Sequence, residues 1–314
     1  MKTQLVSVII PNYNKGEYLK ECLDSVTSQG EIVKEIIIVD DHSDDNSWEI
    51  LLDYSNRFDY VKIFKNPKKG AQSARNYGFL KSSGKYIQWL DSDDILGSNK
   101  IEKQAIVLEQ KNTLSVAFCG WSHFSENINE GIPRESKIWK DYQNPINWLI
   151  DAWSSGNMLV PSCWLVPQRI CAQLTWNETI LKNQDGLYFF DVLMKSQELV
   201  FSSGVLIYYR KPGKTNVSQR QGEKPTRSVL RSYKHYEKIL ERKDNKTVRD
   251  ALAINYLSFI YSISPDFKEM QREAYQSVEK LNLSKLPLVG GSKFQIFQKL
   301  FGFRLALYFK QFFG

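Results

Sequence analysis

Short apolar runs alternate with segments of helical periodicity in the first third of the chain. Residues 6–10 and 35–39 are runs of mostly branched apolar side chains that end at polar, turn-prone positions, as buried parallel strands do. Between them, residues 17–29 carry apolar side chains at helical spacing, and Gly30 suits a helix end. The two runs and the segment that joins them predict a β-α-β unit.

The same alternation continues as far as residue 90. It predicts helices over about 47–58 and 72–82, and strands over 61–64 and 86–90. Strands and helices that alternate in this way favour an α/β fold with a doubly wound, mostly parallel sheet. Such a sheet binds ligands at the carboxyl ends of its strands.

The pattern weakens after Asp94. A helix is predicted over 99–110 and a strand near 116–119, and the chain is helical and basic from about residue 225. The middle section is rich in loops and in tryptophan, and these rings are compatible both with a groove for an acceptor and with an ordinary core. The tryptophans are Trp121, Trp139, Trp148, Trp153, Trp164 and Trp176.

Composition is that of a folded globular protein. Of the 314 residues 42% are hydrophobic and 25% charged, and no run of about 18 apolar residues predicts a membrane-spanning helix. The apolar run at 6–10 is too short for the core of a secretion signal, so we expect a cytoplasmic protein. The cysteines and histidines lack metal-binding spacing, which leaves carboxylates as candidate metal ligands.

Charge is distributed unevenly along the chain. The net charge is +7, yet residues 205–314 hold 21 of the 42 basic residues and only 9 of the 35 acidic ones. This excess predicts an anionic partner: a membrane surface, a nucleic acid or a phosphorylated substrate. Residues 292–313 carry an apolar stripe from Phe294 to Phe312 with Lys299 and Lys310 on the other side. The stripe favours either an interfacial helix at an anionic membrane or packing against its own domain.

Three carboxylates crowd the end of the strand predicted at 86–90. Asp91, Asp93 and Asp94 repel one another unless a cation or several hydrogen-bond donors compensate their charge. Mg²⁺ or Mn²⁺ is the simplest compensator, because such ions accept one or two protein carboxylates and take further oxygens from substrate phosphates. A solvated acidic turn that caps the next helix is the alternative.

A second acidic pair, Asp40-Asp41, closes the strand at 35–39 and could accept hydrogen bonds from a base or a ribose. Arg75 follows the flexible Gly70. It could orient the acidic loop or bind a diphosphate in bidentate fashion, and a surface salt bridge is the alternative.

An ordered set of motifs over about the first 110 residues closely resembles glycosyltransferase family 2. The matching residues are Val6-Ser7-Val8-Ile9-Ile10-Pro11-Asn12-Tyr13-Asn14, Leu23-Asp24-Ser25-Val26, Gln29, Ile38-Val39-Asp40-Asp41-His42-Ser43, Gly70, Ala74-Arg75-Asn76 and Leu90-Asp91-Ser92-Asp93-Asp94. The resemblance implies a GT-A fold and an inverting transfer from a nucleoside-diphosphate sugar, most commonly a UDP-sugar. His42 departs from the family, in which glycine is usual at this position.

The resemblance also implies roles for single residues. Pro11 and Tyr13 would lie beside the nucleoside, Asp41 would bind the base, and Arg75 would contact the diphosphate or the acidic loop. The segment Asp91-Ser92-Asp93 would be the Asp-x-Asp motif that holds the donor. Asp93 is the first candidate for the ligand of Mn²⁺ or Mg²⁺, and Asp94 is the second.

The segment 176–189 resembles the part of the family that bears the catalytic base. Asp185 matches the base, and Gln184 replaces the glutamate that usually precedes it. Tyr208-Tyr209-Arg210, with Ser218 downstream, resembles a motif that closes over the donor phosphates. We therefore expect Arg210 to help bind the donor.

These observations predict a glycosyltransferase with a GT-A domain over 1–220 and a basic helical region over 221–314. The donor part would cover about 1–110 and the acceptor part, with the base, about 111–220. We expect the acceptor to be a saccharide or a lipid-linked saccharide in the synthesis of cell-surface polysaccharide. The enzyme could attach peripherally to the inner face of the plasma membrane. The alternatives are a non-catalytic nucleotide-sugar binding protein and a nucleic-acid binder, and the second lacks any recognisable reading motif.

Overall fold

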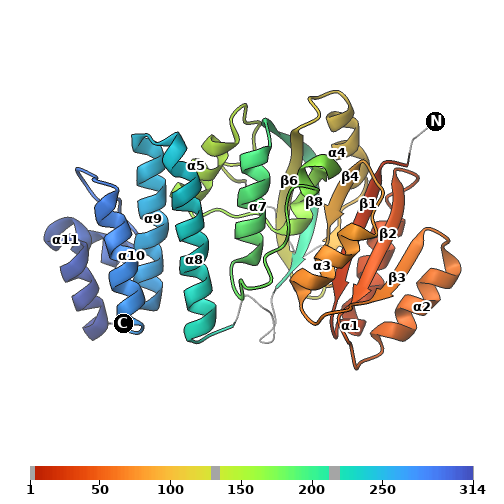
Figure 1. Cartoon of the computed structure of the whole chain (residues 1–314), viewed down its shortest axis with the longest axis horizontal. Coiled ribbons are helices and arrows are strands. Elements are labelled where there is room, and N and C mark those ends of the chain that lie inside the picture. The colour runs from red at the N-terminus through yellow and green to blue at the C-terminus, as the bar shows by residue number, and fades with distance from the viewer. Residues whose placement is uncertain (1–3, 129–134, 212–219, 314) are drawn as a thin grey trace. The chain divides into compact units, whose positions relative to one another are not determined.

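The computed structural model describes residues 4–128, 135–211 and 220–313, and Figure 1 shows its course. The chain divides into two compact units. Unit 1 consists of Met1–Trp148, Leu159–Glu178 and Gln184–Gly213, and unit 2 consists of Leu149–Met158, Thr179–Asn183 and Lys214–Gly314. The domain boundaries expected near residues 110 and 220 stay predictions.

Unit 1 is built on an eight-stranded sheet of order β3-β2-β1-β4-β7-β6-β8-β5. Strands β1, β2, β3 and β4 are parallel, β6 and β8 are parallel, and β7 and β5 run antiparallel to their neighbours. The predicted α/β fold with a mostly parallel sheet is therefore confirmed. The strands are β1 Val6–Asn12, β2 Val33–Asp40, β3 Val61–Lys65, β4 Tyr86–Trp89, β5 Ile95–Leu96, β6 Ser115–Phe124, β7 Trp164–Pro167 and β8 Glu198–Arg210.

The helices of unit 1 connect these strands and cover the sheet (Figure 1). Branched apolar side chains such as those of Val8, Ile9 and Ile37 are fully buried, because helices pack against both faces of the parallel strands. The helices are α1 Gly16–Thr27, α2 Ser47–Arg57, α3 Ala71–Leu80, α4 Lys100–Glu109, α6 Gln168–Cys171 and α7 Gln184–Lys195, with a 3₁₀ turn at Pro161–Cys163; α5 Pro145–Ser155 begins in unit 1 and continues in unit 2.

Several tryptophans of the middle section belong to the core of unit 1. Trp148, Trp164 and Trp176 are buried, and Trp176 stacks on Tyr188 with ring centroids 4.1 Å apart. Trp121 and Trp139 are partly exposed. Trp148, Trp164 and Trp176 are therefore part of an ordinary core. Only the remaining tryptophans are still candidates for lining a groove for an acceptor.

Unit 2 contains four long helices (Figure 1): α8 Glu223–Leu240, α9 Lys246–Ile263, α10 Lys268–Lys280 and α11 Ser292–Phe313. Their core includes Tyr256, Phe259 and Met270 from the middle of the unit and Phe294 and Phe303 from α11. In the part of the chain that the structure describes, no helix has the length and apolar character needed to cross a membrane.

Candidate active site

The carboxyl ends of β1, β2 and β4 bring most of the predicted donor-binding residues to one edge of the sheet. Asn12 at the end of β1 pairs in register with Asp40 at the end of β2, and the backbone N–H of Asp41 donates to the Asn12 carbonyl at 2.7 Å. The chain leaves β4 one residue before Asp91. Pro11 lies at the end of β1, and Asp41 and the acidic loop 91–94 follow the neighbouring strands β2 and β4, as expected for a ligand site of a parallel sheet.

Arg75 on α3 is the central cation of this edge. Its side chain is buried, its Nη2 donates to Asp91 Oδ1 at 2.6 Å, and the guanidinium lies 4.4 Å from the centroid of the Trp176 ring. Burial opposes its charge, but Asp91 and Asp185 outweigh burial and raise the pKa of Arg75. Two of its donors, Nε and Nη1, find no hydrogen-bond partner among the residues that the structure describes. Such donors are costly when buried, so Arg75 is suited to binding an anion.

Asp93 is paired with Lys15, a residue that the sequence patterns did not single out. Lys15 Nζ lies 2.7 Å from Asp93 Oδ2, and both side chains are partly exposed. Lys15 stands where the chain turns from β1 into α1. A basic residue after the first strand, opposite an acidic loop on a neighbouring strand, is the signal that could have found it.

Asp94 and Ser92 lie deeper than Asp93, and both are buried. Asp94 accepts hydrogen bonds from Ser162 Oγ at 3.1 Å and from the backbone N–H of Arg210 at 3.2 Å. Burial raises the pKa of Asp94, and the neighbouring Asp93 and Asp91 raise it further. Both of its oxygens are thus engaged inside the protein, where they tie the acidic loop to the 3₁₀ turn at Pro161–Cys163 and to β8.

Arg210 is also held within unit 1. Its Nη2 meets Glu21 at 2.5 Å, its Nε donates to the Asp93 carbonyl at 3.1 Å, and its Nη1 donates to the Ser125 carbonyl at 2.7 Å. The guanidinium lies between the rings of Tyr18 and Phe124, 4.3 Å from each centroid. Arg210 therefore positions the acidic loop, and direct contact with the donor stays a prediction. Ser218, from the same motif, lies outside the described residues.

Asp41 is buried and fixes the turn before α3. Its carboxylate accepts from the backbone N–H of Gly70 at 2.8 and 2.9 Å and from Asn66 Nδ2 at 2.7 Å. Gly70 adopts φ 133°, a conformation that favours glycine. Tyr13 is 45% exposed, and Lys69 Nζ lies 5.2 Å from its ring centroid. An exposed ring at this edge is available to stack on a base.

Asp185 occupies the first turn of α7 and is partly buried. The surrounding protein raises the pKa of Asp185 to about 6 through burial, which the positive charge of Arg75 opposes and the negative charge of Asp91 reinforces. These couplings place Asp185 near the Arg75–Asp91 pair. A carboxylate with a pKa close to neutrality is suited to accept a proton.

Three aromatic side chains lie on one face of β6 and β8 beside the acidic loop. The ring centroids of Trp121 and His123 are 4.6 Å apart, and that of Tyr209 lies 5.6 Å and 5.4 Å from them. Tyr209 directly precedes Arg210, whose N–H bonds to Asp94. Burial raises the pKa of Tyr209, and the carboxylates of the acidic loop and Asp185 raise it further, so its phenol lies close to the predicted reaction centre.

The acidic loop fits a divalent ion of the kind that substrate phosphates help to bind. Among the described residues no three or more His, Cys, Asp or Glu side chains form a closed metal cage. Mg²⁺ and Mn²⁺ need only one or two carboxylates when a diphosphate supplies the other oxygens. The carboxylate of Asp93 is partly exposed and forms its ion pair with the partly exposed Lys15, so it meets that need better than the buried Asp94.

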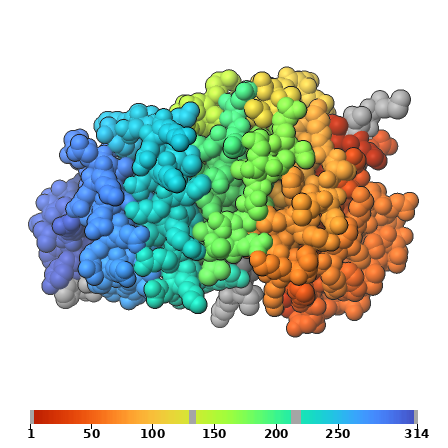
Figure 2. Space-filling view, viewed as in Figure 1, coloured from red at the N-terminus to blue at the C-terminus, as the bar shows by residue number. Residues whose placement is uncertain are grey.

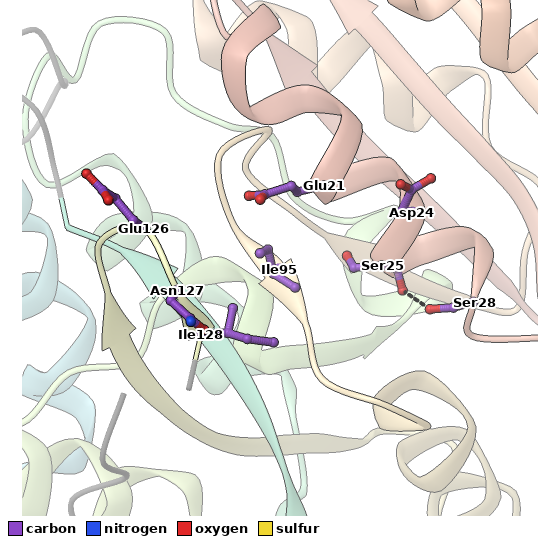
Figure 3. A pocket seen from close by; sticks show the side chains of 8 residues that line it. All are labelled: Glu21, Asp24, Ser25, Ser28, Ile95, Glu126, Asn127 and Ile128. Carbon is purple, nitrogen blue, oxygen red and sulfur yellow. Dashed lines mark hydrogen bonds between the residues drawn. The ribbon is translucent and has the colours of Figure 1, made fainter. Parts of the chain in front are cut away.

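A hollow of unit 1 lies away from these residues, beside α1 and β5 (Figure 3). It is lined by Glu21, Asp24 and Glu126 together with Ser25, Ser28, Ile95, Asn127 and Ile128. Its three charged side chains are acidic and would repel a diphosphate. None of the predicted site residues lines it.

Comparison with known proteins decides the family. Residues 7–174, more than half of the chain, match the family described as glycosyl transferase family 2. The chain belongs to this family. Its fold is the GT-A fold, as the resemblance of its motifs implied.

Similar curated proteins carry glycosyltransferase names. A glycosyltransferase of Haemophilus influenzae is 29% identical over 70% of this chain and 84% of its own length. One from Escherichia coli is 27% identical over 80% of this chain and 74% of its own. One from Rickettsia felis is 31% identical over 70% of this chain, but the match spans only 36% of that longer protein.

Two solved structures share the fold. TarS 1–349 of Staphylococcus aureus, in complex with UDP-GlcNAc, has a TM-score of 0.70 at 17% identity, over 96% of this chain and 89% of that one. The mannosyltransferase PcManGT of Pyrobaculum calidifontis, in complex with GDP-Man and Mn²⁺, has a TM-score of 0.56 at 15% identity, over 96% and 80%. At these identities the likeness concerns the fold.

Proposed function

We propose that this protein is an inverting, metal-assisted glycosyltransferase that moves a sugar from a nucleoside diphosphate, with UDP the first choice, to a hydroxyl group of a saccharide. The observation that carries the proposal is the cluster of Arg75, Asp91 and Asp185. It combines a buried cation that has two unpaired donors with a carboxylate whose pKa is raised to about 6.

The donor would lie along the edge formed by β1, β2 and β4. The ring of Tyr13 would stack on the base, Asp41 would hold the turn that faces the base, and the Asp91-Ser92-Asp93 segment would meet the ribose and the diphosphate. Structures of the same fold are known with UDP-GlcNAc and with GDP-Man, which supports a nucleotide-sugar donor. Pro11, the last but one residue of β1, would line the same site.

Chemistry needs one base and a way to stabilise the departing diphosphate. Asp185 would take the proton of the acceptor hydroxyl. The oxygen of that hydroxyl would form a bond to the anomeric carbon of the donor sugar while the bond between this carbon and the nucleoside diphosphate breaks. The diphosphate leaves with the electron pair of that bond, and Arg75 has unpaired donors to meet the new charge. A divalent ion bound to Asp93 would supply further neutralisation of the leaving group.

The acceptor is proposed to be a saccharide or a lipid-linked saccharide. Trp121, His123 and Tyr209 offer flat aromatic faces near the reaction centre, and such faces suit the apolar side of a sugar ring. A role in cell-surface polysaccharide synthesis and a cytoplasmic location fit this acceptor and the four free, buried cysteines.

A non-catalytic nucleotide-sugar binding protein is the second candidate. The Arg75–Asp91 pair alone would serve binding equally well. The raised pKa of Asp185 favours the enzyme, because binding a donor requires no group poised to accept a proton. Release of nucleotide during turnover separates the two.

The first experiment measures thermal stabilisation of the protein by UDP-, GDP- and dTDP-sugars with and without Mn²⁺. A ligand that binds only the folded state at about 100 times its Kd adds about 2.7 kcal/mol to the unfolding free energy, and so raises Tm. We expect one class of donor to raise Tm in the presence of Mn²⁺, and the Asp93→Asn variant to lose that response.

Asp53→Asn is the matched control, because Asp53 is an exposed carboxylate on α2. It should respond to donor and metal as the wild type does. Equal stabilisation of Asp93→Asn would remove Asp93 from the metal site. Absence of stabilisation by every nucleotide sugar would contradict the donor-binding proposal.

A further inference from the structure

The C-terminal helix α11 exposes an unusual number of large apolar side chains. Half of the exposed large hydrophobic side chains among the described residues lie on this one helix. Leu300 is 70% exposed and Ile296 57%. The six are Ile296, Phe297, Leu300, Phe301, Leu305 and Tyr308. The helix, at the violet-blue end of the colour scale, forms part of the surface visible in Figure 2.

The opposite side of α11 is anchored in unit 2. Phe294, Phe303 and Ala306 are buried in the core of the helical unit, and Lys310 Nζ donates to the carbonyl oxygen of Tyr261 at 2.5 Å. The exposed side chains therefore do not result from a helix detached from its unit. They form a second apolar face of an anchored element.

A kink shapes the exposed face. Gly302 adopts φ 78° and ψ 166°, which interrupts the helix. Beyond the kink, Phe309 contacts both Phe297 and Phe301, with ring centroids 5.8 and 6.0 Å apart. Aromatic side chains of both segments thus meet across the kink, and Tyr308 lies beside Phe309. Ile296, Leu300 and Leu305 add exposed aliphatic side chains on the same helix.

The charged side chains of α11 itself are all basic. They are Lys293, Lys299, Arg304 and Lys310. Arg304 is paired with Glu279 of α10 at 2.9 Å. Lys293 and Lys299 are exposed on α11 itself. An apolar face bordered by cations matches the interface of an anionic bilayer, where acyl chains cover the apolar groups and lipid head groups meet the cations.

A second copy of the chain fits this face less well. A two-fold interface places the same patch against itself, so the cations of one copy would face those of the other. The segment offers no carboxylate to pair with them. A nucleic acid would satisfy the cations but would leave the exposed leucine, isoleucine and phenylalanine side chains without an apolar partner.

We propose that the exposed face of α11 docks this protein on an anionic lipid bilayer, with Ile296, Leu300 and Leu305 inserted among the acyl chains and with Lys293 and Lys299 at the head groups. The helix would lie in the plane of the interface. The proposal concerns unit 2 alone. It places the proposed transferase at a lipid bilayer.

The test is co-sedimentation of the full chain with vesicles. We expect the protein to sediment with mixed phosphatidylcholine–phosphatidylglycerol vesicles and much less with pure phosphatidylcholine, and added salt should weaken the binding. The triple variant Ile296→Ser, Leu300→Ser, Leu305→Ser should bind at least about tenfold more weakly. The double variant Lys293→Glu, Lys299→Glu should lose the preference for anionic vesicles.

Leu80→Ser with Ile106→Ser is the matched control, because it removes exposed aliphatic side chains of unit 1. It should sediment as the wild type does. Binding of the triple variant equal to that of the wild type would overturn the proposal, as would a wild type that stays in the supernatant with both vesicles. A wild type that self-associates through this face, with dimers that the triple variant abolishes and no vesicle binding, would assign the face to a second copy.

Vesicle binding needs neither donor nor turnover. Its failure would therefore leave the transferase proposal intact, and a failure of donor binding would leave the docking surface intact. Circular dichroism of each variant shows whether α11 is still folded, so that loss of binding is not mistaken for loss of the helix.

Discussion

Lys15 and Asp93 form an ion pair at the position proposed for a divalent ion. The ammonium group lies 2.7 Å from Oδ2 of the Asp93 carboxylate, which would hold the metal, and both side chains are partly exposed. A metal ion and the lysine ammonium group would compete for this carboxylate, because two cations so close together repel each other. Metal binding should therefore displace Lys15, which would then be available to an anionic substrate.

Replacement of Lys15 by methionine tests this competition. The variant leaves Asp93 without its counter-charge, so Mn²⁺ should bind several-fold more tightly in the absence of nucleotide, as measured by the loss of the free-Mn²⁺ electron paramagnetic resonance signal. Lys20→Met, an exposed lysine on the same helix, is the control and should bind Mn²⁺ as the wild type does. Unchanged or weaker Mn²⁺ binding in Lys15→Met would contradict the competition.

Asp185 is the second residue on which the mechanism depends. Asp185→Asn keeps the shape of the side chain and removes the base, so the variant should fold, respond to donor in thermal shift, and lose transfer by a factor of about 10²–10⁴. Because the base must be ionised, wild-type kcat/KM should fall as the pH is lowered through about 6. Full activity of Asp185→Asn would assign the proton transfer to another group.

Sequence motifs identified some of the site residues, whereas the roles of others follow only from contacts in the structure. Asp91, Asp93 and Asp185 were predicted because their motifs resemble a family, and the structure brings Asp91 and Asp185 to the same arginine. Lys15 belongs to no quoted motif, and its partner is 78 residues away in the chain. Arg210 was expected at the phosphates, yet its partners inside unit 1, Glu21 and the carbonyl oxygens of Asp93 and Ser125, cannot be read from local spacing.

At the scale of elements, the apolar pattern predicted unit 1 well. The runs at 6–10 and 35–39 lie within β1 and β2, and the segments predicted as helices overlap α1, α2, α3 and α4. These elements alternate at short range, so each buried face is set by residues next to one another in sequence. Strand β7 antiparallel between β4 and β6 was not predicted, because its pairing joins distant parts of the chain.

The C-terminal helix shows the limit of a pattern based on ideal periodicity. The stripe from Phe294 to Phe312 assumes a straight helix, but Gly302 interrupts it with a φ that favours glycine. Within the segment before Gly302, Phe294 is buried, whereas Phe297 and Phe301 are exposed. The two expectations for the stripe, packing on its own unit and an exposed apolar face, thus describe opposite sides of one element. The side chain of Phe312 lies outside the described residues.

At the scale of the whole molecule, buried carboxylates set the response of stability to acid. Burial opposes the charge of Glu35 and of Asp40, but hydrogen bonds outweigh burial and lower the pKa of each carboxyl group. Glu35 accepts these hydrogen bonds from Lys62, Ser7 and Ser83. Asp40 accepts them from Lys65, Ser43 and Asn12. A lowered pKa in the folded state stabilises the fold above the unfolded-state pKa. That stability is lost as the pH falls through the folded-state pKa. Asp185 acts in the opposite sense, because its raised pKa makes folding less favourable as the pH rises from about 4 to about 6.

Glu35 is the carboxylate whose replacement should change this response most clearly. It accepts from Ser7 Oγ at 2.7 Å, from the Ser83 N–H at 2.7 Å and from Lys62 Nζ at 2.5 Å, and so joins β1, β2, β3 and the turn before β4. Glu35→Gln should lower the unfolding free energy at pH 7 by about 2 kcal/mol, the magnitude of hydrogen bonds to a charged group. It should also make Tm less dependent on pH below about 4.5, because the variant has no proton to bind at this position.

Thermal melts between pH 3 and pH 7, in steps of about one unit, measure both effects. Glu31→Gln, an exposed glutamate just before β2, should melt as the wild type does, and a Glu35→Gln curve parallel to the wild-type curve would show that acid acts on the fold through other carboxylates.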